Sequence, residues 1–163
     1  MTLPKPRKIE IERYEVGLSQ FKIIDNLIKL SANESALGPS PKAMESFQKE
    51  KDKIFKYPES ECSSLRDIIS EKFNINSERI ICGAGSDQIF DLTCQLFIEP
   101  GDEVVVTEYG FIMHRIYASL YRAKVLLAKE KNFKASVDEI LKKVSRKTKI
   151  VFLANPNNPT GTY

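Results

Sequence analysis

Two short segments carry residues whose types and spacing suit chemistry. GAGSD (residues 83–87) puts small residues and free backbone N–H groups where a helix is expected to begin, and the positive end of a helix can hold a phosphate. NPNNPTG (residues 155–161) packs two prolines, three asparagines and a glycine into seven residues. Such a loop fixes the backbone direction and presents amides that donate or accept hydrogen bonds.

Each segment also has a simpler interpretation. GAGSD is neither a Walker A loop, since no GK[ST] follows, nor a dinucleotide fingerprint, since Gln88 stands where a third glycine would be. Taken alone, it is better explained as a tight turn with Ser86 as N-cap. NPNNPTG could be an ordinary turn, but an X–Pro bond held by surrounding structure can aim a side chain into a site. A functional interpretation is favoured there.

The elements around these segments alternate between strand and helix. Apolar runs predict strands at 79–82, 104–106, 124–128 and 149–154. Amphipathic helices are expected between them: one from Asp87 with Ile89, Leu92 and Leu96 inward, one through Met113–Leu120, and one opened by a capping box of Ser136 and Glu139. This order is typical of an α/β fold with a mostly parallel sheet flanked by helices. Ligands of such sheets bind beyond the carboxyl ends of strands, where GAGSD, TEYGF (residues 107–111) and NPNNPTG lie.

Two further helices precede this alternation. One is predicted from Pro41, after Ser40 as N-cap, to about Lys53, and one from about Ser64 with an apolar stripe for packing. The stripe consists of Leu65, Ile68, Ile69 and Phe73. The first 30 residues lack a sustained period and are expected to form an arm.

Composition narrows the class of protein. With 163 residues, 42% hydrophobic and 29% charged, the chain is expected to be globular with one core. Its net charge of +3 is spread along the sequence, which does not indicate a nucleic-acid partner. Three cysteines without CxxC spacing argue against a disulfide framework or a metal site and favour the cytoplasm. No apolar run predicts a membrane span or a leader.

Five motifs in order give a family resemblance. LSANESALGPSPKAM (residues 30–44), KYPE (56–59), GAGSDQIF (83–90), EYGF (108–111) and FLANPNNPTGTY (152–163) resemble the N-terminal half of the histidinol-phosphate aminotransferases, which are fold type I pyridoxal-phosphate enzymes. The resemblance implies an arm and substrate segment over residues 1–40 and the first part of the large, cofactor-binding domain over residues 41–163. It also implies that the C-terminal half of that domain is missing.

The resemblance assigns cofactor roles to several residues. Gly85, Ser86 and Asp87 match the loop that holds the cofactor phosphate at a helix N-terminus. Tyr109 matches the aromatic residue that stacks on the pyridine ring. Asn158 matches the asparagine that hydrogen-bonds the phenolic oxygen of the cofactor and stabilises its anion.

Other positions of the resemblance concern the substrate and the subunit contact. Tyr57 matches a tyrosine that reaches the cofactor phosphate of the other subunit, which implies a homodimer with shared sites. Asn33 and Glu34 match the segment that closes over the substrate, and Tyr14 matches the arm residue beside it. His114 is the one histidine; it is expected on a partly buried helix face, without a catalytic or metal-binding role.

The family's Schiff-base lysine lies downstream of the asparagine loop, so no catalytic residue is assigned in these 163 residues. The aspartate that pairs with the pyridine nitrogen and the arginine that binds the substrate carboxylate lie downstream as well. Lys142, Lys143 and Lys147 are no substitutes, being at a solvated helix end. The isolated chain is expected not to turn over, because transamination needs that lysine. A homodimer or a complementing C-terminal half is therefore the expected partner.

The leading hypothesis from sequence is a transaminase of histidine biosynthesis that moves an amino group between histidinol phosphate and 2-oxoglutarate, two small molecules. Another fold type I enzyme, such as an aromatic aminotransferase or a phospho-amino-acid decarboxylase, would keep every quoted motif. A noncatalytic truncated gene product is the alternative from a different class.

Overall fold

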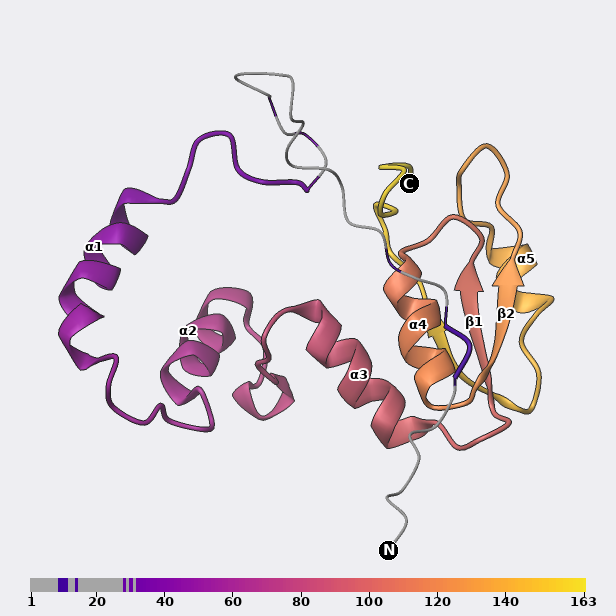
Figure 1. Cartoon of the computed structure of the whole chain (residues 1–163), viewed down its shortest axis with the longest axis horizontal. Helices are drawn as coiled ribbons and strands as arrows, with labels where there is room; N and C mark the ends of the chain where they lie inside the picture. Colours follow the sequence, from indigo (N-terminus) through magenta and orange to yellow (C-terminus); the bar gives the residue numbers. More distant parts are fainter. Residues whose placement is uncertain (1–8, 12–13, 15–27, 29, 31) are drawn as a thin grey trace, which may run out of the picture. The chain divides into compact units, whose positions relative to one another are not determined.

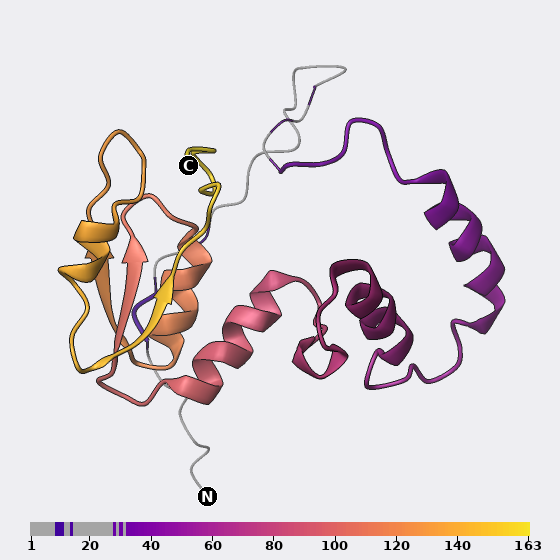
Figure 2. The same ribbon diagram turned by 180° about the vertical axis from the view of Figure 1, so that it is seen from behind.

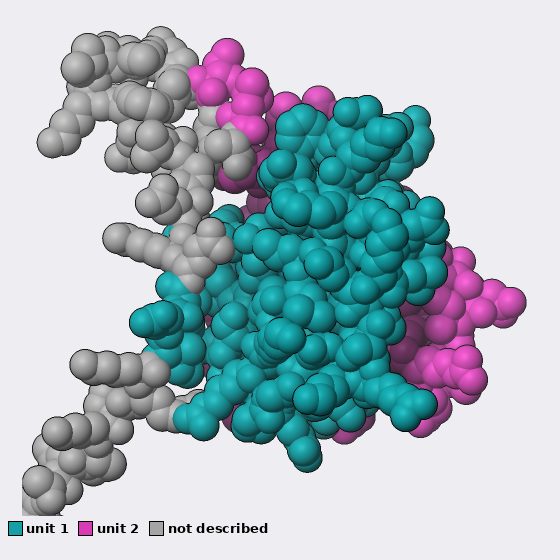
Figure 3. Space-filling model, turned by 90° about the vertical axis from the view of Figure 1, so that its right-hand side faces the viewer, with its two compact units in different colours: residues 1–14, 83–163 teal, residues 15–82 magenta. Residues whose placement is uncertain are grey.

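The computed structural model describes residues 9–11, 14, 28, 30 and 32–163. The chain forms two compact units, one of residues 1–14 with 83–163 and one of residues 15–82 (Figure 3). The predicted arm falls almost wholly outside the described residues. The predicted boundary at residue 40 stays a prediction.

A three-stranded parallel sheet forms the centre of the first unit, and this confirms the predicted α/β class. Its strands are β1 (Glu103–Thr107), β2 (Lys124–Ala128) and β3 (Thr148–Phe152), in the order β2-β1-β3 (Figure 1 and Figure 2). All of β1 is buried, because a central strand of a parallel sheet has neighbours at both edges and helices on both faces. The carboxyl ends of the three strands therefore lie at one end of the sheet.

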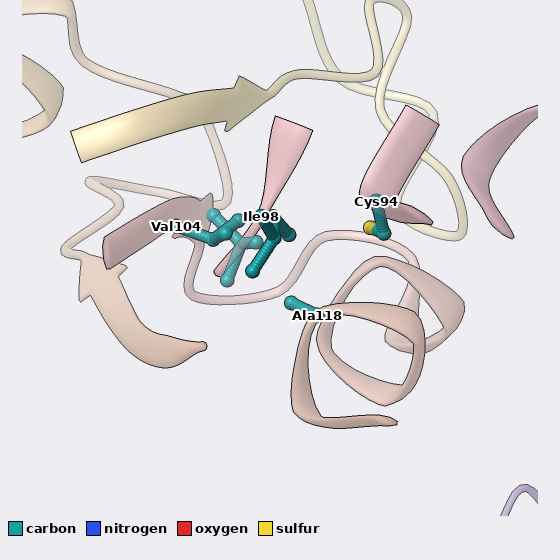
Figure 4. Close-up of a cluster of buried hydrophobic side chains, with 5 residues drawn as sticks. Cys94, Ile98, Val104 and Ala118 are labelled. Atoms are coloured by element: carbon teal, nitrogen blue, oxygen red, sulfur yellow. The ribbon is translucent and has the colours of Figure 1, made fainter. Parts of the chain in front are cut away.

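Helices α3 (Ser86–Phe97) and α4 (Ile112–Leu120) pack on one face of this sheet. The contact is a cluster of buried apolar side chains from α3, the turn after it, β1 and α4: Cys94, Ile98, Val104, Val106 and Ala118 (Figure 4). Burial raises the pKa of the Cys94 thiol to about 11. This cysteine is therefore a protonated, small apolar group of the core at neutral pH.

The inward face of α3 differs from the predicted one. Leu96 was expected inward with Ile89 and Leu92, but its side chain is 74% exposed, whereas Cys94 is fully buried. Phe90, one turn before Cys94, faces the aromatic side chains of the core. Both faces of this helix carry apolar residues, so the 3.6-residue period alone could not select between them.

Helix α5 (Val137–Leu141) covers the other face of the sheet. Its Ile140 packs with Val105, whose side chain points away from the α3 and α4 face because side chains alternate along a strand. The Ser136 N-cap is confirmed, since its hydroxyl oxygen accepts a hydrogen bond of 3.4 Å from the backbone N–H of Glu139. The Glu139 carboxylate pairs with a lysine three residues later, so only half of the predicted capping box forms.

In the unit of residues 15–82, the described part of the chain forms four helical segments. They are α1 (Pro41–Glu50), the 3₁₀ helix η1 (Lys51–Lys53), α2 (Ser63–Phe73) and the 3₁₀ helix η2 (Ser77–Arg79). Both predicted α-helices are confirmed. Their large apolar side chains are not buried, however: Phe47 of α1 is 60% exposed and Ile68 of the α2 stripe is 61% exposed. Among the described residues of this unit, most of the α2 stripe is exposed, so the packing predicted for it is not found there.

The strand predicted at residues 79–82 is also wrong. Residues 77–79 form η2, which the Asn76 side chain initiates by accepting a hydrogen bond from the N–H of Glu78. Ile80 has an extended backbone with φ −111° and ψ 125°. An extended segment becomes a strand only when its backbone groups bond to a neighbouring strand, and the described residues offer none to this segment. Among the helices of the described residues, none is long and apolar enough to cross a membrane.

His114 lies on the buried face of α4, as predicted, among aromatic rings. Its side chain is 5% exposed, stacks on Phe152 with 4.8 Å between ring centroids, and meets Phe90 edge to face at 4.6 Å. Burial lowers the pKa of this imidazole, and the charge of Asp87 opposes the shift. The neutral ring is thus part of the core.

This burial predicts a loss of stability in acid. In a soluble protein that contains this chain, we expect the free energy of unfolding to fall as the pH is lowered below about 6.5, the ordinary pKa of histidine. The folded imidazole takes up its proton at a lower pH than the unfolded one, so protons favour the unfolded chain. Urea titrations between about pH 7 and pH 5 should show this slope. The dependence of stability on pH should be weaker in His114→Phe. An equal dependence in the variant and the unchanged protein would show that His114 is not its source.

Candidate functional site

The turn before α3 leaves a helix N-terminus open. Gly85 is the N-cap, with φ 85°, and no side chain caps the helix. Only glycine adopts this left-handed conformation readily. Ser86 is the first helical residue, so the simpler interpretation in which Ser86 caps the helix is wrong. Its hydroxyl has no hydrogen-bond partner within the part of the chain that the structure describes.

Hydrogen bonds within the turn decide which amides remain available. The Gly85 N–H donates to the Gly83 carbonyl over 2.9 Å. The Gln88 side chain reaches back and accepts from the N–H of residue 84 over 2.6 Å. The N–H groups of Ser86 and Asp87, in the first turn of α3, have no partner inside the helix. These two amides and the Ser86 hydroxyl form a set of donors suited to a phosphate.

Tyr109 follows β1 in a tight turn. The Gly110 N–H donates to the Thr107 carbonyl over 3.2 Å, and a Cβ on Gly110 would overlap the Thr107 hydroxyl. A side chain at position 110 would therefore have to displace the Thr107 side chain. The Tyr109 side chain is 45% exposed, and its ring contacts that of Phe133 with 5.0 Å between centroids, tilted by 55°. Part of the ring remains open to a ligand.

In the asparagine loop after β3, two neighbouring asparagines have different surroundings. Asn157 is 6% exposed, and its backbone N–H and side-chain amide donate to the Thr162 carbonyl and the Thr160 hydroxyl, at 2.8 and 2.9 Å. Asn158 is exposed, and its side chain has no hydrogen-bond partner among the described residues. The peptide bonds before Pro156 and Pro159 are both cis. Asn157 thus anchors the loop, and Asn158 is available to a ligand.

The loops after β1 and β3 contact each other at the carboxyl ends of the strands, and α3 packs against the last residue of β3. The side-chain amide of Asn157 donates to the Tyr109 carbonyl over 3.4 Å and so joins the loops after β3 and β1. Phe90, one turn into α3 from Ser86, contacts Phe152, the last residue of β3, with 5.6 Å between ring centroids. An open aromatic ring and a free amide therefore lie at the carboxyl end of the sheet, and α3, whose N-terminus carries donors for an anion, packs beside it. Such an arrangement suits a planar molecule that carries a phosphate and an acceptor oxygen.

The remaining predicted residues belong to both units. Tyr14 belongs to the same unit as the sheet, and its ring meets that of Phe111 edge to face with 6.3 Å between centroids. Tyr57, Asn33 and Glu34 belong to the unit of residues 15–82. Tyr57 is 95% exposed, and Asn33 has a left-handed backbone with φ 52°. Their approach to the site stays a prediction.

Sequence reasoning missed two residues of this region, Glu130 and Asn157. Glu130 follows β2 and accepts a hydrogen bond of 3.1 Å from the Tyr109 N–H. Its own N–H donates to the Glu108 carboxylate over 3.3 Å, and Lys129 forms an ion pair with that carboxylate. These contacts, the lysine first, lower the pKa of Glu108. The position of Glu130 just beyond a predicted strand was the one signal in the sequence that pointed to it.

Comparisons with known proteins agree on the family. The profile of the family described as aminotransferase class I and II matches residues 25–163. The chain is 58% identical over its whole length to a histidinol-phosphate aminotransferase of Pelagibacter ubique and 44% identical to one of Paramagnetospirillum magneticum, and it covers 45% and 46% of these relatives. The chain thus spans about half the length of the curated relatives it matches.

Solved structures share the fold. The crystal structure of histidinol-phosphate aminotransferase from Sinorhizobium meliloti in complex with pyridoxal-5'-phosphate gives a TM-score of 0.77 at 24% identity, over 81% of this chain and 36% of that one. An aspartate aminotransferase of Thermus thermophilus gives 0.72 at 20% identity, over 79% of this chain and 39% of that one. The extent of the family match, together with this shared fold, shows that the chain belongs to the class I and II aminotransferases.

Proposed function

We propose that the protein represented by this chain is a pyridoxal-phosphate enzyme that transfers an amino group between histidinol phosphate and 2-oxoglutarate in histidine biosynthesis. The observation that carries the choice of substrate is the 58% identity, over every residue of the chain, to a relative named histidinol-phosphate aminotransferase. The cofactor is supported by the family and by the cofactor complex of the S. meliloti neighbour.

The open N-terminus of α3 fits the phosphate of this cofactor. The donors there are the backbone N–H groups of Ser86 and Asp87 and the Ser86 hydroxyl. No carboxylate of the described residues accepts a hydrogen bond within the turn. A dianion gains both hydrogen bonds and the favourable end of the helix dipole at such a place. The role of Gly85 is conformational, because its φ of 85° forms the turn before the helix. Its N–H is not available to a ligand, since it donates to the Gly83 carbonyl.

Tyr109 and Asn158 fit the ring of the cofactor. When bound, pyridoxal phosphate supplies the electron-withdrawing ring system through which an amino group is exchanged. The half-exposed Tyr109 ring offers it a flat face. The unpaired Asn158 amide would donate a hydrogen bond to the phenolic oxygen and so favour its anion.

The Schiff-base lysine implied by the family resemblance matches none of the 163 residues. We propose that this lysine lies in the region that corresponds to the rest of the P. ubique relative, of which this chain covers 45%. A homodimer in which Tyr57 reaches the phosphate of the partner site is proposed with it, supported by the 95% exposure of Tyr57. Tyr14, Asn33 and Glu34 are proposed to contact the substrate. The cytoplasm is the proposed compartment, supported by three free cysteines.

A chimera tests this function. It joins residues 1–163 to the remainder of the P. ubique relative and is purified with pyridoxal phosphate. We expect kcat/KM for histidinol phosphate, with 2-oxoglutarate as acceptor, to exceed that for tyrosine or aspartate by about a hundredfold or more, because a pocket built for a polar group discriminates strongly against donors that lack it. The authentic P. ubique enzyme is the control. A preference for an aromatic amino acid, or release of CO₂ from a phospho-amino acid, would favour the other fold type I activities. An inactive chimera beside an active control would favour a noncatalytic product.

A further inference from the structure

We propose that Glu130 and Asn157 are positioning residues that clamp the backbone of Tyr109 and thereby aim its ring at the cofactor; the part that concerns the cofactor rests on the function proposed above. The two residues come from different loops, after β2 and after β3. We call the pair the Tyr109 clamp.

The clamp holds both polar groups of the Tyr109 backbone. The Glu130 carboxylate accepts from its N–H through Oε1 at 3.1 Å, and the Asn157 amide donates to its C=O through Nδ2 at 3.4 Å. Fixing the N–H and the C=O of one residue restrains the two peptide planes on either side of its Cα. The direction of the Cα–Cβ bond, and hence the start of the ring, follows from these planes.

The outer atoms of the clamp are unusual. Glu130 Oε2 and Asn157 Oδ1 are both buried without a hydrogen-bond partner among the described residues. Buried acceptors of this kind are rare in folded proteins, and each calls for an explanation. In Glu130 the bonded oxygen accepts from the Tyr109 N–H, and in Asn157 the bonded nitrogen donates to the Tyr109 carbonyl and to the Thr160 hydroxyl. We infer that holding Tyr109 is the reason that the other polar atom of each side chain is left unpaired.

Further contacts hold the clamp itself in place. The N–H of Glu130 donates to the Glu108 carboxylate at 3.3 Å, so the loops after β1 and β2 exchange one carboxylate-to-backbone bond in each direction. Asn157 is held by its bond to the Thr160 hydroxyl. The contact of Phe133 with the Tyr109 ring limits the ring's rotation about the direction that the clamp sets.

The test measures cofactor affinity in the chimera by titrating the apoprotein with pyridoxal phosphate and following visible circular dichroism. Glu130→Ala should weaken affinity roughly three- to tenfold, in line with couplings between contacting residues. Glu130→Gln keeps an acceptor oxygen and should restore most of it. Asn157→Asp, which turns an oxygen toward the Tyr109 carbonyl, should weaken affinity to a similar degree.

A double-mutant cycle distinguishes an effect on the orientation of the Tyr109 ring from a general loss of structure. In the Tyr109→Ala background, Glu130→Ala should change the affinity less than about twofold. The matched control is Glu103→Ala: Glu103 is a buried carboxylate at the opposite end of β1, bonded to Ser145 and Lys124, and its loss should reduce stability but not cofactor affinity. An undiminished effect of Glu130→Ala without the Tyr109 ring, or no effect with it, would overturn the proposal.

Amide hydrogen exchange in the apoprotein judges the clamp independently of the cofactor. Protection of the Tyr109 N–H, measured relative to that of the β1 amides, should fall in Glu130→Ala and Asn157→Asp but not in Glu103→Ala. If Tyr109→Ala leaves cofactor affinity unchanged, the proposed role of that ring fails, while lost protection would still support the clamp. Unchanged protection in both clamp variants would overturn the clamp, whatever the enzyme does.

Discussion

Asn158→Ala is expected to lower kcat/KM of the chimera about a hundredfold, the usual cost of removing one donor that stabilises a developing or bound anion in an enclosed site. It should also raise the pKa of the visible absorption band of the bound cofactor. The Asn158 amide is proposed to donate to the phenolic oxygen, so its loss disfavours the form in which that oxygen carries the negative charge. Spectra recorded across a pH series, together with initial rates, measure both effects.

Asn155→Ala is the matched control for this prediction. Asn155 lies in the same loop, is also exposed and also precedes a cis proline. We expect it to change kcat/KM and the pKa of the band little. An unchanged titration in Asn158→Ala, or equal effects of the two variants, would show that the wrong asparagine has been placed at the cofactor.

Ser86→Ala should weaken pyridoxal-phosphate affinity of the chimera about tenfold or more, since a hydrogen bond to a charged group contributes about 1.5–3 kcal/mol. The ranking of amino donors should not change, because the Ser86 hydroxyl is proposed to bind the cofactor phosphate and not the amino donor. The control is Ser63→Ala. Ser63 is likewise the first residue of an α-helix, but its hydroxyl donates to Glu59.

Tyr57→Phe should weaken cofactor affinity in a similar way, and subunit mixing tests whether it acts across a dimer. If Tyr57 reaches the partner site, a heterodimer of one Ser86→Ala and one Tyr57→Phe subunit has one site with both defects and one with neither. Activity at limiting cofactor should then partly recover on mixing. If both single variants are weak and the mixture shows no recovery, Tyr57 acts within its own subunit or not at the cofactor.

The candidate site was only partly predictable from the sequence. Motif order identified the three loops, and a parallel sheet was enough to bring those after β1 and β3 to one end. The sequence did not show which backbone N–H groups of GAGSD stay free, because the Gln88 side chain accepts a hydrogen bond from the N–H of residue 84. The clamp was not predictable, because Asn157 and Tyr109 are 48 residues apart in sequence and Glu130 belongs to no motif.

The sequence by itself determined the elements whose causes are local. The apolar run at Lys124–Ala128 is a strand with the predicted bounds, and Ser136 caps α5, because periodicity and capping act over a few residues. Tertiary structure alone decided which face of α3 is buried, that residues 80–82 form no strand, and that Asn157 is buried while Asn158 is exposed. The physical reason is that burial and strand pairing depend on partners far away in the chain, which no local pattern specifies.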